Sequence, residues 1–360
     1  MAPISRRRLL SSTGIAVATT SIAGCTGDGG NGSGSNGSSD QSLEAQAREE
    51  GSMTFYSVID ESGMRNTILP PFQEQYDWMD FQLVSQGISE IASSMSTEYQ
   101  TSNVESDAAI NIKGTMSPLA DAGVFRKPTP NGDLIQFLEE NYSDDLYTLP
   151  AVPGYLFPIQ VIYHTDRVSD DEIPESYEDF ANPALEGRIA IDDPTVLGST
   201  GGQFATLRPI WGPDKWERVM TDISNNGVTI ASSTSETARI VAQGGADVAL
   251  SSQNSLLSIQ DDGAPVEGLW LEPTTALNLP VYFAANSQNP KAAEFFAMWL
   301  LTNEGQRAIA ETGRVPVNSE IATESGLIPS GVEVRPVAFN VESYYDESET
   351  WIERYEGIFG

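Results

Sequence analysis

The sequence is poor in the residues that build disulfides, metal centres and basic surfaces. Its 360 residues include one cysteine, one histidine and 19 lysines and arginines, against 51 acidic residues. A single cysteine excludes a disulfide within the chain. His164, without clustered cysteine or carboxylate ligands, gives weak support to a metal site. Because the net charge is −32 and no basic stripe is present, we expect no nucleic-acid partner.

Common catalytic patterns are also missing. The sequence has no G-x-S-x-G, H-E-x-x-H or G-x-x-x-x-G-K motif and no Cys–His arrangement. Asp192 and Asp193 are adjacent acids, but neighbours on a strand point to opposite faces. A turn before Pro194 explains the two acids better than a catalytic pair does. We therefore predict that the protein is not an enzyme and needs no cofactor.

The acidic residues are spread along the whole chain, which has only four lysines: Lys113, Lys127, Lys215 and Lys291. Dispersed acidity suits a surface that works in concentrated salt, because the Debye length falls to about 3 Å at 1 M and self-repulsion is screened. Our hypothesis is a haloarchaeal origin.

The N-terminus has the features of an export signal. Ser5–Leu10 reads SRRRLL, a twin-arginine pattern, and small and apolar residues follow it. That run is too short for a membrane span, which needs about 20 apolar residues. It ends in IAG before Cys25, which resembles a lipobox. We predict a twin-arginine (Tat) signal over 1–25 and lipidation of Cys25; the alternative is a plain signal peptide with an incidental cysteine.

Residues 26–42 are nearly all Gly, Ser, Asn and Asp and are predicted to form a flexible linker. The predicted reach is roughly 20–25 Å. Such a tether would hold the protein at the extracellular face of the cell membrane.

From residue 43 onward, short apolar strands alternate with helical patterns, which predicts an α/β fold with parallel strands and right-handed crossovers. Pro70-Pro71 is expected to kink or break an early helix. Asn289 before Pro290 indicates a helix start, and Gly313 a helix end. About 280 residues are too many for one small core, so we expect two lobes.

Five segments in this order resemble the extracellular solute-binding proteins of ABC importers, in the branch that binds ferric iron, thiamine, polyamines and phosphonates. The resemblance covers about residues 51–321. The segments are GSMTFYSVIDE, YLFPIQVIYHTDRV, IPESYEDFANPALEGRIAIDDPT, GGADVAL and NPKAAEFFAMWLLTNEGQ.

This resemblance implies a type 2 periplasmic-binding-protein-like fold, with two α/β lobes joined by two crossing strands near residues 149–163 and 269–283. Lobe 1 would comprise 43–150 plus 275–360, and lobe 2 would comprise 151–274. A small polar or anionic solute or a metal chelate would be captured in the cleft and delivered to a permease with its ATPase. We expect a monomer.

Candidate ligand-binding residues follow from the rule that ligands bind beyond the carboxyl ends of parallel strands. Polar residues stand at those ends, at the helix starts beyond them and at the first crossing strand: Ser57, Gln86, Lys113, Tyr155, Asp192, Ser199, Thr200, Ser233, Thr234 and Gln253.

Each of these positions also has a structural interpretation. The GSTGG segment at 198–202 could cradle an anion or simply begin a helix. Ser233 fits a capping box with Glu236, which is a sufficient role by itself. Lys113 could face an anionic ligand or be a solvated loop lysine.

Iron binding is doubtful on the residues present. Ferric iron prefers phenolate and carboxylate oxygens. The ferric-binding relatives carry an adjacent tyrosine pair after the strand that matches residues 246–250, whereas this chain has Ser251-Ser252-Gln253-Asn254. The pair Tyr344-Tyr345 lies near the C-terminus, where a closing helix that docks on the body is the favoured interpretation. A secreted enzyme on the same scaffold and a sensory lipoprotein remain the alternative functions.

Overall fold

The structure is a computed structural model that describes residues 41–196, 199–336 and 347–360. The predicted signal with Cys25, nearly all of the linker, and Tyr344-Tyr345 lie outside the described residues. Among the described residues, no helix combines the length and the apolar character that crossing a membrane requires.

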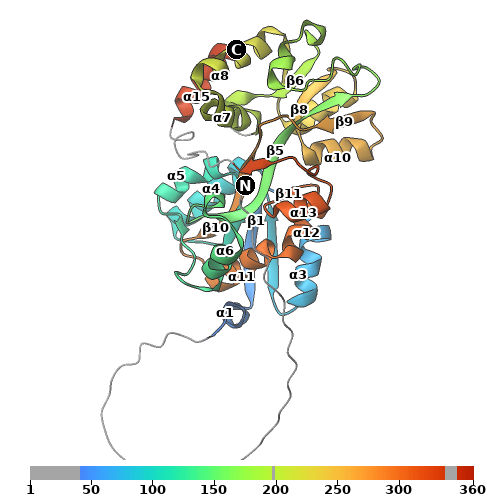
Figure 1. Ribbon diagram of the computed structural model, residues 1–360. Coiled ribbons are helices and arrows are strands. Elements are labelled where there is room, and N and C mark those ends of the chain that lie inside the picture. Colours follow the sequence, from blue (N-terminus) through green and yellow to red (C-terminus); the bar gives the residue numbers. More distant parts are fainter. Residues whose placement is uncertain (1–40, 197–198, 337–346) are drawn as a thin grey trace, which may run out of the picture. The chain divides into compact units, whose positions relative to one another are not determined.

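The fold is a mixed α/β structure with strand order β2-β1-β3-β10-β5-β8-β6-β7 (Figure 1). β1 pairs in parallel with β2 and β3, and β6 pairs in parallel with β7 and β8, which confirms the predicted parallel strands. These strands are β1 (Ser52–Ser57), β2 (Asp80–Ser85), β3 (Ala108–Ile110), β6 (Ile189–Asp192), β7 (Val228–Ala231) and β8 (Val248–Ser252).

Two long antiparallel strands stand between these parallel groups: β5 (Val152–His164) and β10 (Thr274–Ala284). The first half of β5 pairs with β10, and its second half pairs with β8. β5 therefore belongs to both sheets, where a crossing strand was predicted. Four short strands complete the sheets: β4 (Phe125–Arg126), β9 (Val266–Leu269), β11 (Val315–Pro316) and β12 (Val334–Pro336).

Helices cover both faces of the sheets. In chain order the helices of the described residues are α1 (Leu43–Glu50), α2 (Glu61–Gly63), η1 (Met64–Ile68), α3 (Leu69–Gln75), α4 (Ile88–Thr101), α5 (Lys113–Asp121), α6 (Asp133–Asn141), η2 (Asp144–Leu146), η3 (Tyr177–Ala181), η4 (Pro183–Leu185), η5 (Pro194–Val196), α7 (Ser199–Trp211), α8 (Pro213–Asn225), α9 (Thr234–Ala242), α10 (Gln253–Asp261), α11 (Pro290–Leu301), α12 (Asn303–Glu311), α13 (Ser319–Glu324) and α15 (Ser348–Phe359).

The predicted helix boundaries hold at three marked places. Pro70 and Pro71 fall in the first turn of α3, directly after the π-helical turn η1, where a missing amide hydrogen is tolerated. Asn289 occupies the N-cap position of α11 without a capping hydrogen bond from its side chain, and Pro290 is the first residue of the helix. Gly313 has a φ of +75° just after α12, a left-handed conformation that glycine adopts without strain.

The largest hydrophobic core lies between the first sheet and α11. Phe296 packs edge-to-face against Phe55 and Phe72, with ring centroids 5.1 and 5.0 Å apart. All three residues are at most 1% exposed. This aromatic packing supports the sheet whose strand ends carry the candidate residues Ser57, Gln86 and Lys113.

The C-terminal helix packs on the second sheet's side of the molecule. Trp351 of α15 contacts Trp216 of α8 at 5.6 Å between ring centroids, and both belong to the core around β6 and β8. Residues 275–360 were assigned to lobe 1 as one block, and α15 departs from that assignment. The cause is that the apolar face of α15 is buried by α7 and α8.

Candidate functional site

Polar residues lie at the carboxyl ends of the parallel strands, as the sequence predicted. α4 and α5 begin just after β2 and β3, and α9 and α10 begin just after β7 and β8. The first-turn amides of a helix lack partners within the helix, and they carry a partial positive charge. Each strand end is thus combined with hydrogen-bond donors.

Two predicted residues of the first sheet already have local partners. The Ser57 hydroxyl is fully buried, accepts from the Ile59 amide at 3.0 Å and donates to the Ile59 carbonyl at 3.2 Å. Gln86, which is half-buried, accepts from the Ser94 hydroxyl at 3.4 Å. Ser57 therefore shapes the loop after β1, and Gln86 is the more accessible of the two.

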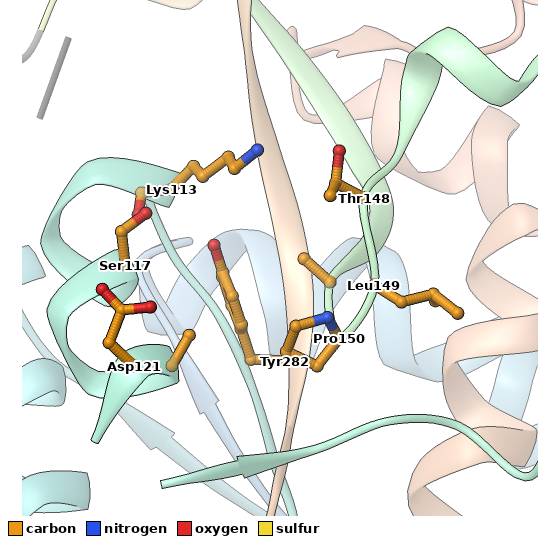
Figure 2. A pocket seen from close by; sticks show the side chains of 9 residues that line it. Lys113, Ser117, Asp121, Thr148, Leu149, Pro150 and Tyr282 are labelled. Carbon is orange, nitrogen blue, oxygen red and sulfur yellow. The ribbon is translucent and has the colours of Figure 1, made fainter. Parts of the chain in front are cut away.

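Lys113 is the first residue of α5, and its helix start is tied to that of α4. The Asn111 side chain accepts from the Ile112 amide at 2.8 Å and donates to the Ile88 carbonyl at 3.0 Å. Lys113 is half-buried and lines a cavity of about 190 Å³ in the first lobe (Figure 2). The structure therefore does not place Lys113 on a fully solvated loop.

In the second lobe, the ends of β6 and α7 meet through a buried pair. Thr200 donates a hydrogen bond to Asp192, and the two residues are 0% and 5% exposed. Ser199 begins α7, but its side chain lies outside what the structure describes. Asp193 accepts from the Thr195 amide at 2.9 Å, as the predicted turn requires.

A chain of hydroxyl groups links the starts of α9 and α10. Thr234 and Ser252 are 3.3 Å apart at their hydroxyl oxygens, and Ser252 lies 2.8 Å from the Ser255 hydroxyl. Ser233 caps α9 by accepting from the Glu236 amide at 3.2 Å. Ser233 is exposed, whereas Thr234 is buried. The structure therefore brings Thr234 together with the strand end of β8.

Gln253 opens α10 and joins the crossing strand β5. Its side-chain oxygen accepts a hydrogen bond from Gln160. Gln253 and Asn254 line a small gap of about 10 Å³ together with Arg314. Gln253 therefore bonds to β5 and lines the same gap as Arg314, which precedes β11.

Tyr155 is placed differently from the expectation of a ligand contact. Its side chain is only 3% exposed and belongs to the core of the first lobe. Burial raises the pKa of the Tyr155 phenol, and this effect is opposed by the nearby Arg314. Since β5 is buried on both faces, its sequence has no alternation that could reveal which side chains reach the surface.

Arg314, which the sequence analysis missed, stands at this junction. Its guanidinium lies 5.9 Å from the centre of the Tyr155 ring and 3.2 Å from a carboxylate oxygen of Asp60. Its side chain is 13% exposed, against 63% for Asp60. Burial raises the pKa of Asp60, but the Gly63 amide and Arg314 outweigh it, so that the pKa is lowered. The sequence feature that could have revealed Arg314 is a basic residue directly after Gly313, the glycine that ends the preceding helix in a left-handed conformation.

The candidate positions thus offer hydroxyls, amides and helix starts, with Lys113 lining one cavity and Arg314 lining a separate gap. Within the described ranges, no group of three or more His, Cys, Asp or Glu side chains is arranged to hold a metal ion. Such a set suits reversible binding of a polar small molecule.

Comparison with known proteins places this geometry in a family. The family described as bacterial extracellular solute-binding protein matches residues 67–334. A Haemophilus influenzae protein described as uncharacterized is 25% identical over 143 residues, and the match spans 39% of this chain and 41% of that protein's length.

Solved structures show the same fold. Ferric iron-binding protein A of Mannheimia haemolytica, in an open conformation, has a TM-score of 0.69 at 15% identity, covering 85% of this chain and 98% of that one. AfuA of Actinobacillus pleuropneumoniae, with fructose-6-phosphate bound, has a TM-score of 0.67 at 20% identity, and the match covers 85% of this chain and 98% of that one. Iron-bound HitA of Pseudomonas aeruginosa has a TM-score of 0.66 at 15% identity, and the match covers 85% of this chain and 99% of that one.

Proposed function

Because this chain belongs to the bacterial extracellular solute-binding proteins, we propose that it is the binding component of an ABC importer. It captures a small polar or anionic solute outside the cell and delivers it to a permease that is coupled to an ATPase. No covalent chemistry is required for this role. The lobes are open when empty and close around the solute.

One observation carries this proposal: the polar strand ends of both lobes stand beside the two strands that join them. Gln253 bonds to Gln160 of β5, while Arg314 lies directly before β11, which pairs with the same strand. A ligand held between such groups contacts both lobes at once. Its binding energy can therefore favour the closed form.

The ligand class follows from the charges near the strand ends. Lys113, Arg314 and the helix starts all favour negative charge on the ligand. Solved relatives include iron-binding proteins and a fructose-6-phosphate-bound protein. In this chain, the start of α10 carries serine, glutamine and asparagine side chains. An organic anion fits these donors better than bare ferric iron, which requires harder oxygen ligands.

The export signal and the anchor complete the proposal. The Tat-type arginines, the lipobox-like segment before Cys25 and the Gly/Ser-rich linker support a lipoprotein tethered to the outer face of the membrane. The net charge of −32 supports a role in concentrated salt.

A thermal-shift screen of the full chain in molar KCl tests the function. The panel is phosphate, sugar phosphates, carboxylates, thiamine, polyamines and ferric citrate. A solute at 100 times its dissociation constant should stabilise the fold by about 2.7 kcal/mol. A shift with one chemical class, with the solute recovered unchanged, supports the proposal. Chemical conversion of the solute would instead support the enzyme alternative.

A further inference from the structure

The strand β5 changes sheets between two neighbouring residues. Pro158 is the last residue of β5 that pairs with β10, and Ile159 is the first that pairs with β8. Because proline has no amide hydrogen, Pro158 donates no hydrogen bond to the ladder. Phe157, one residue earlier, packs against the hydrophobic cores of both lobes. The chain therefore passes from the first lobe to the second at Pro158 and Ile159.

The two lobes meet directly beside this point. Residues 313–315 of the first lobe, residues 252–254 of the second lobe and residues 156–158 of β5 line the gap of about 10 Å³. A cavity needs roughly 10–15 Å³ to hold one water molecule. The gap is thus at the lower limit for a single water molecule, and the two lobes pack closely against each other there.

Gly313 is the position at which a side chain would change this contact. A Cβ atom on Gly313 would lie 3.0 Å from a methyl carbon of Leu257 and 3.5 Å from the Cα atom of Asn254, both in α10. α10 packs on β8 and α9 of the second lobe, yet its Leu257 side chain packs against the hydrophobic core of the first lobe. The start of α10 is therefore seated on the first lobe by a leucine next to a glycine.

Gly326 provides a matched comparison within the same lobe. Gly313 follows α12 with a φ of +75°, and Gly326 follows α13 with a φ of +71°. Among the described residues, nothing lies within 4 Å of a Cβ atom added to Gly326. The backbone conformation is therefore the same at both glycines, and the contact with α10 is the difference between them.

We infer that Gly313 is a positioning residue for lobe closure, because its missing side chain lets the start of α10 rest against the first lobe where β5 changes sheets. A side chain at this position holds Leu257 and Asn254 away from the first lobe. Gln253 then moves away from Arg314, and the lobes no longer close fully on a solute that contacts both. This inference rests on the proposed solute-binding function and adds a residue that sets the extent of closure.

Gly313→Asn tests the inference, because asparagine accepts a left-handed conformation more readily than most residues that have a side chain. Gly326→Asn is the matched control, since it changes the same kind of backbone position in open space. Gly313→Ala adds only the Cβ atom and should act in the same direction as Gly313→Asn, but more weakly.

A second change separates the contact from a general loss of folding. Leu257→Ala, added to Gly313→Asn, removes the side chain that the new one meets, and it should reverse at least half of the effect. Leu257→Ala alone is the reference. If the double variant departs further from wild type than Gly313→Asn does, the effect does not pass through α10 and the inference is wrong.

Double electron–electron resonance measures the separation of the lobes in the full chain in molar KCl. The nitroxide labels are attached to Glu74→Cys in α3 and Asp222→Cys in α8, two exposed positions. Cys25→Ser removes the only other thiol. Without solute, Gly313→Asn should change the distribution of label distances, whereas Gly326→Asn should match the wild type.

Calorimetry then measures solute binding by the same variants, with phosphate, citrate, thiamine, spermidine and ferric citrate as probes. The probe that the wild type binds should bind at least tenfold more weakly to Gly313→Asn, and within twofold of wild type to Gly326→Asn. The bound probe should move the label distances of Gly313→Asn only part of the way to the closed distribution of the wild type.

The outcomes separate this inference from the function on which it rests. Wild-type label distances together with wild-type affinity in Gly313→Asn would overturn the inference, as would equal changes in the two asparagine variants. The solute-binding function would still stand if a probe binds. If no probe binds the wild type, that function loses its support, and the solute-free label distances still decide whether Gly313 sets the spacing of the lobes.

Discussion

The hydroxyl of Tyr355 in α15 donates a hydrogen bond of 2.6 Å to the carbonyl oxygen of Gly201 in α7. Gly201 directly follows Thr200, which holds Asp192 at the end of β6. A side chain on Gly201 would collide with the carbonyl of Pro194, so the backbones are in close contact there. The C-terminal helix therefore supports the start of α7, where a candidate binding pair lies.

Replacing Tyr355 with phenylalanine should lower the free energy of unfolding by about 1 kcal/mol, because a buried hydrogen bond is lost while the ring stays packed. Urea unfolding in molar KCl measures the change. The control is Tyr163→Phe, which removes a surface hydrogen bond to Glu267 and should cost less than half as much. Equal effects of the two variants would mean that the Tyr355 contact does not stabilise α7.

The carboxylate of Asp247 is 4% exposed and is bound by Arg167 and, at 2.5 Å, by Arg188. Asp247→Asn should cost about 3 kcal/mol near neutral pH, because two arginines lose a buried partner. Urea unfolding measures this change.

The loss of unfolding free energy caused by Asp247→Asn should depend on pH and become smaller as the pH falls. Burial raises the pKa of Asp247, but hydrogen bonds from Arg167 and Arg188 outweigh it, and the pKa is lowered in the folded state. The carboxylate therefore stabilises the fold above its unfolded pKa of about 3.9. That contribution is lost as the pH falls through the folded pKa. A difference in the free energy of unfolding between wild type and Asp247→Asn that grows below pH 4 would contradict this assignment.

Arg314→Met should weaken binding of an anionic solute at least tenfold, because a partly buried guanidinium near the strand ends is removed. Calorimetry with the anion that gives the largest thermal shift measures the change. Arg307→Met is the matched control, since Arg307 is 57% exposed and pairs with the exposed Glu324 at 3.6 Å. A comparable loss in both variants would point to net charge rather than to a local contact.

Stability should rise with salt. At a net charge of −32, repulsion across the surface weakens as the Debye length falls from about 10 Å at 0.1 M to about 3 Å at 1 M. The melting temperature in KCl should therefore increase across this range. A flat or falling melting temperature would remove the argument for a protein suited to concentrated salt.

Cys25→Ser should abolish lipidation if the lipobox interpretation is right. Expression in a host that exports Tat lipoproteins, followed by cell fractionation, measures the result. The wild-type chain should stay with the membrane, and the variant should appear in the soluble fraction. Retention of the variant at the membrane would favour another means of attachment.

Local patterns were sufficient for many elements of the fold. The strand end at Ser57 and the helix start at Asn289-Pro290 depend on residues next to one another, so the sequence predicted them. The pairing of segments that lie far apart in the chain could not be predicted from neighbouring residues. Arg314 reaches the site only because β11 pairs with β5 at Tyr155 and Leu156.

Two other differences between the sequence prediction and the structure have the same cause, namely contacts between distant segments. The amphipathic pattern of α15 predicted that the helix docks, but Trp351 and Tyr355 could have packed on either lobe. Lys113 was predicted from its place after a strand, yet only the fold brings Thr148 and Tyr282 into the lining of the same cavity. Side-chain patterns thus predicted faces, and tertiary contacts decided their partners.

The most direct test of solute binding is a calorimetric titration of the full chain with the solute that gives the largest thermal shift, followed by mass spectrometry of the recovered solute. Our account predicts one solute bound per chain and its recovery in unchanged form. The absence of a binding heat for every solute in the panel, or chemical conversion of the bound solute, would contradict it.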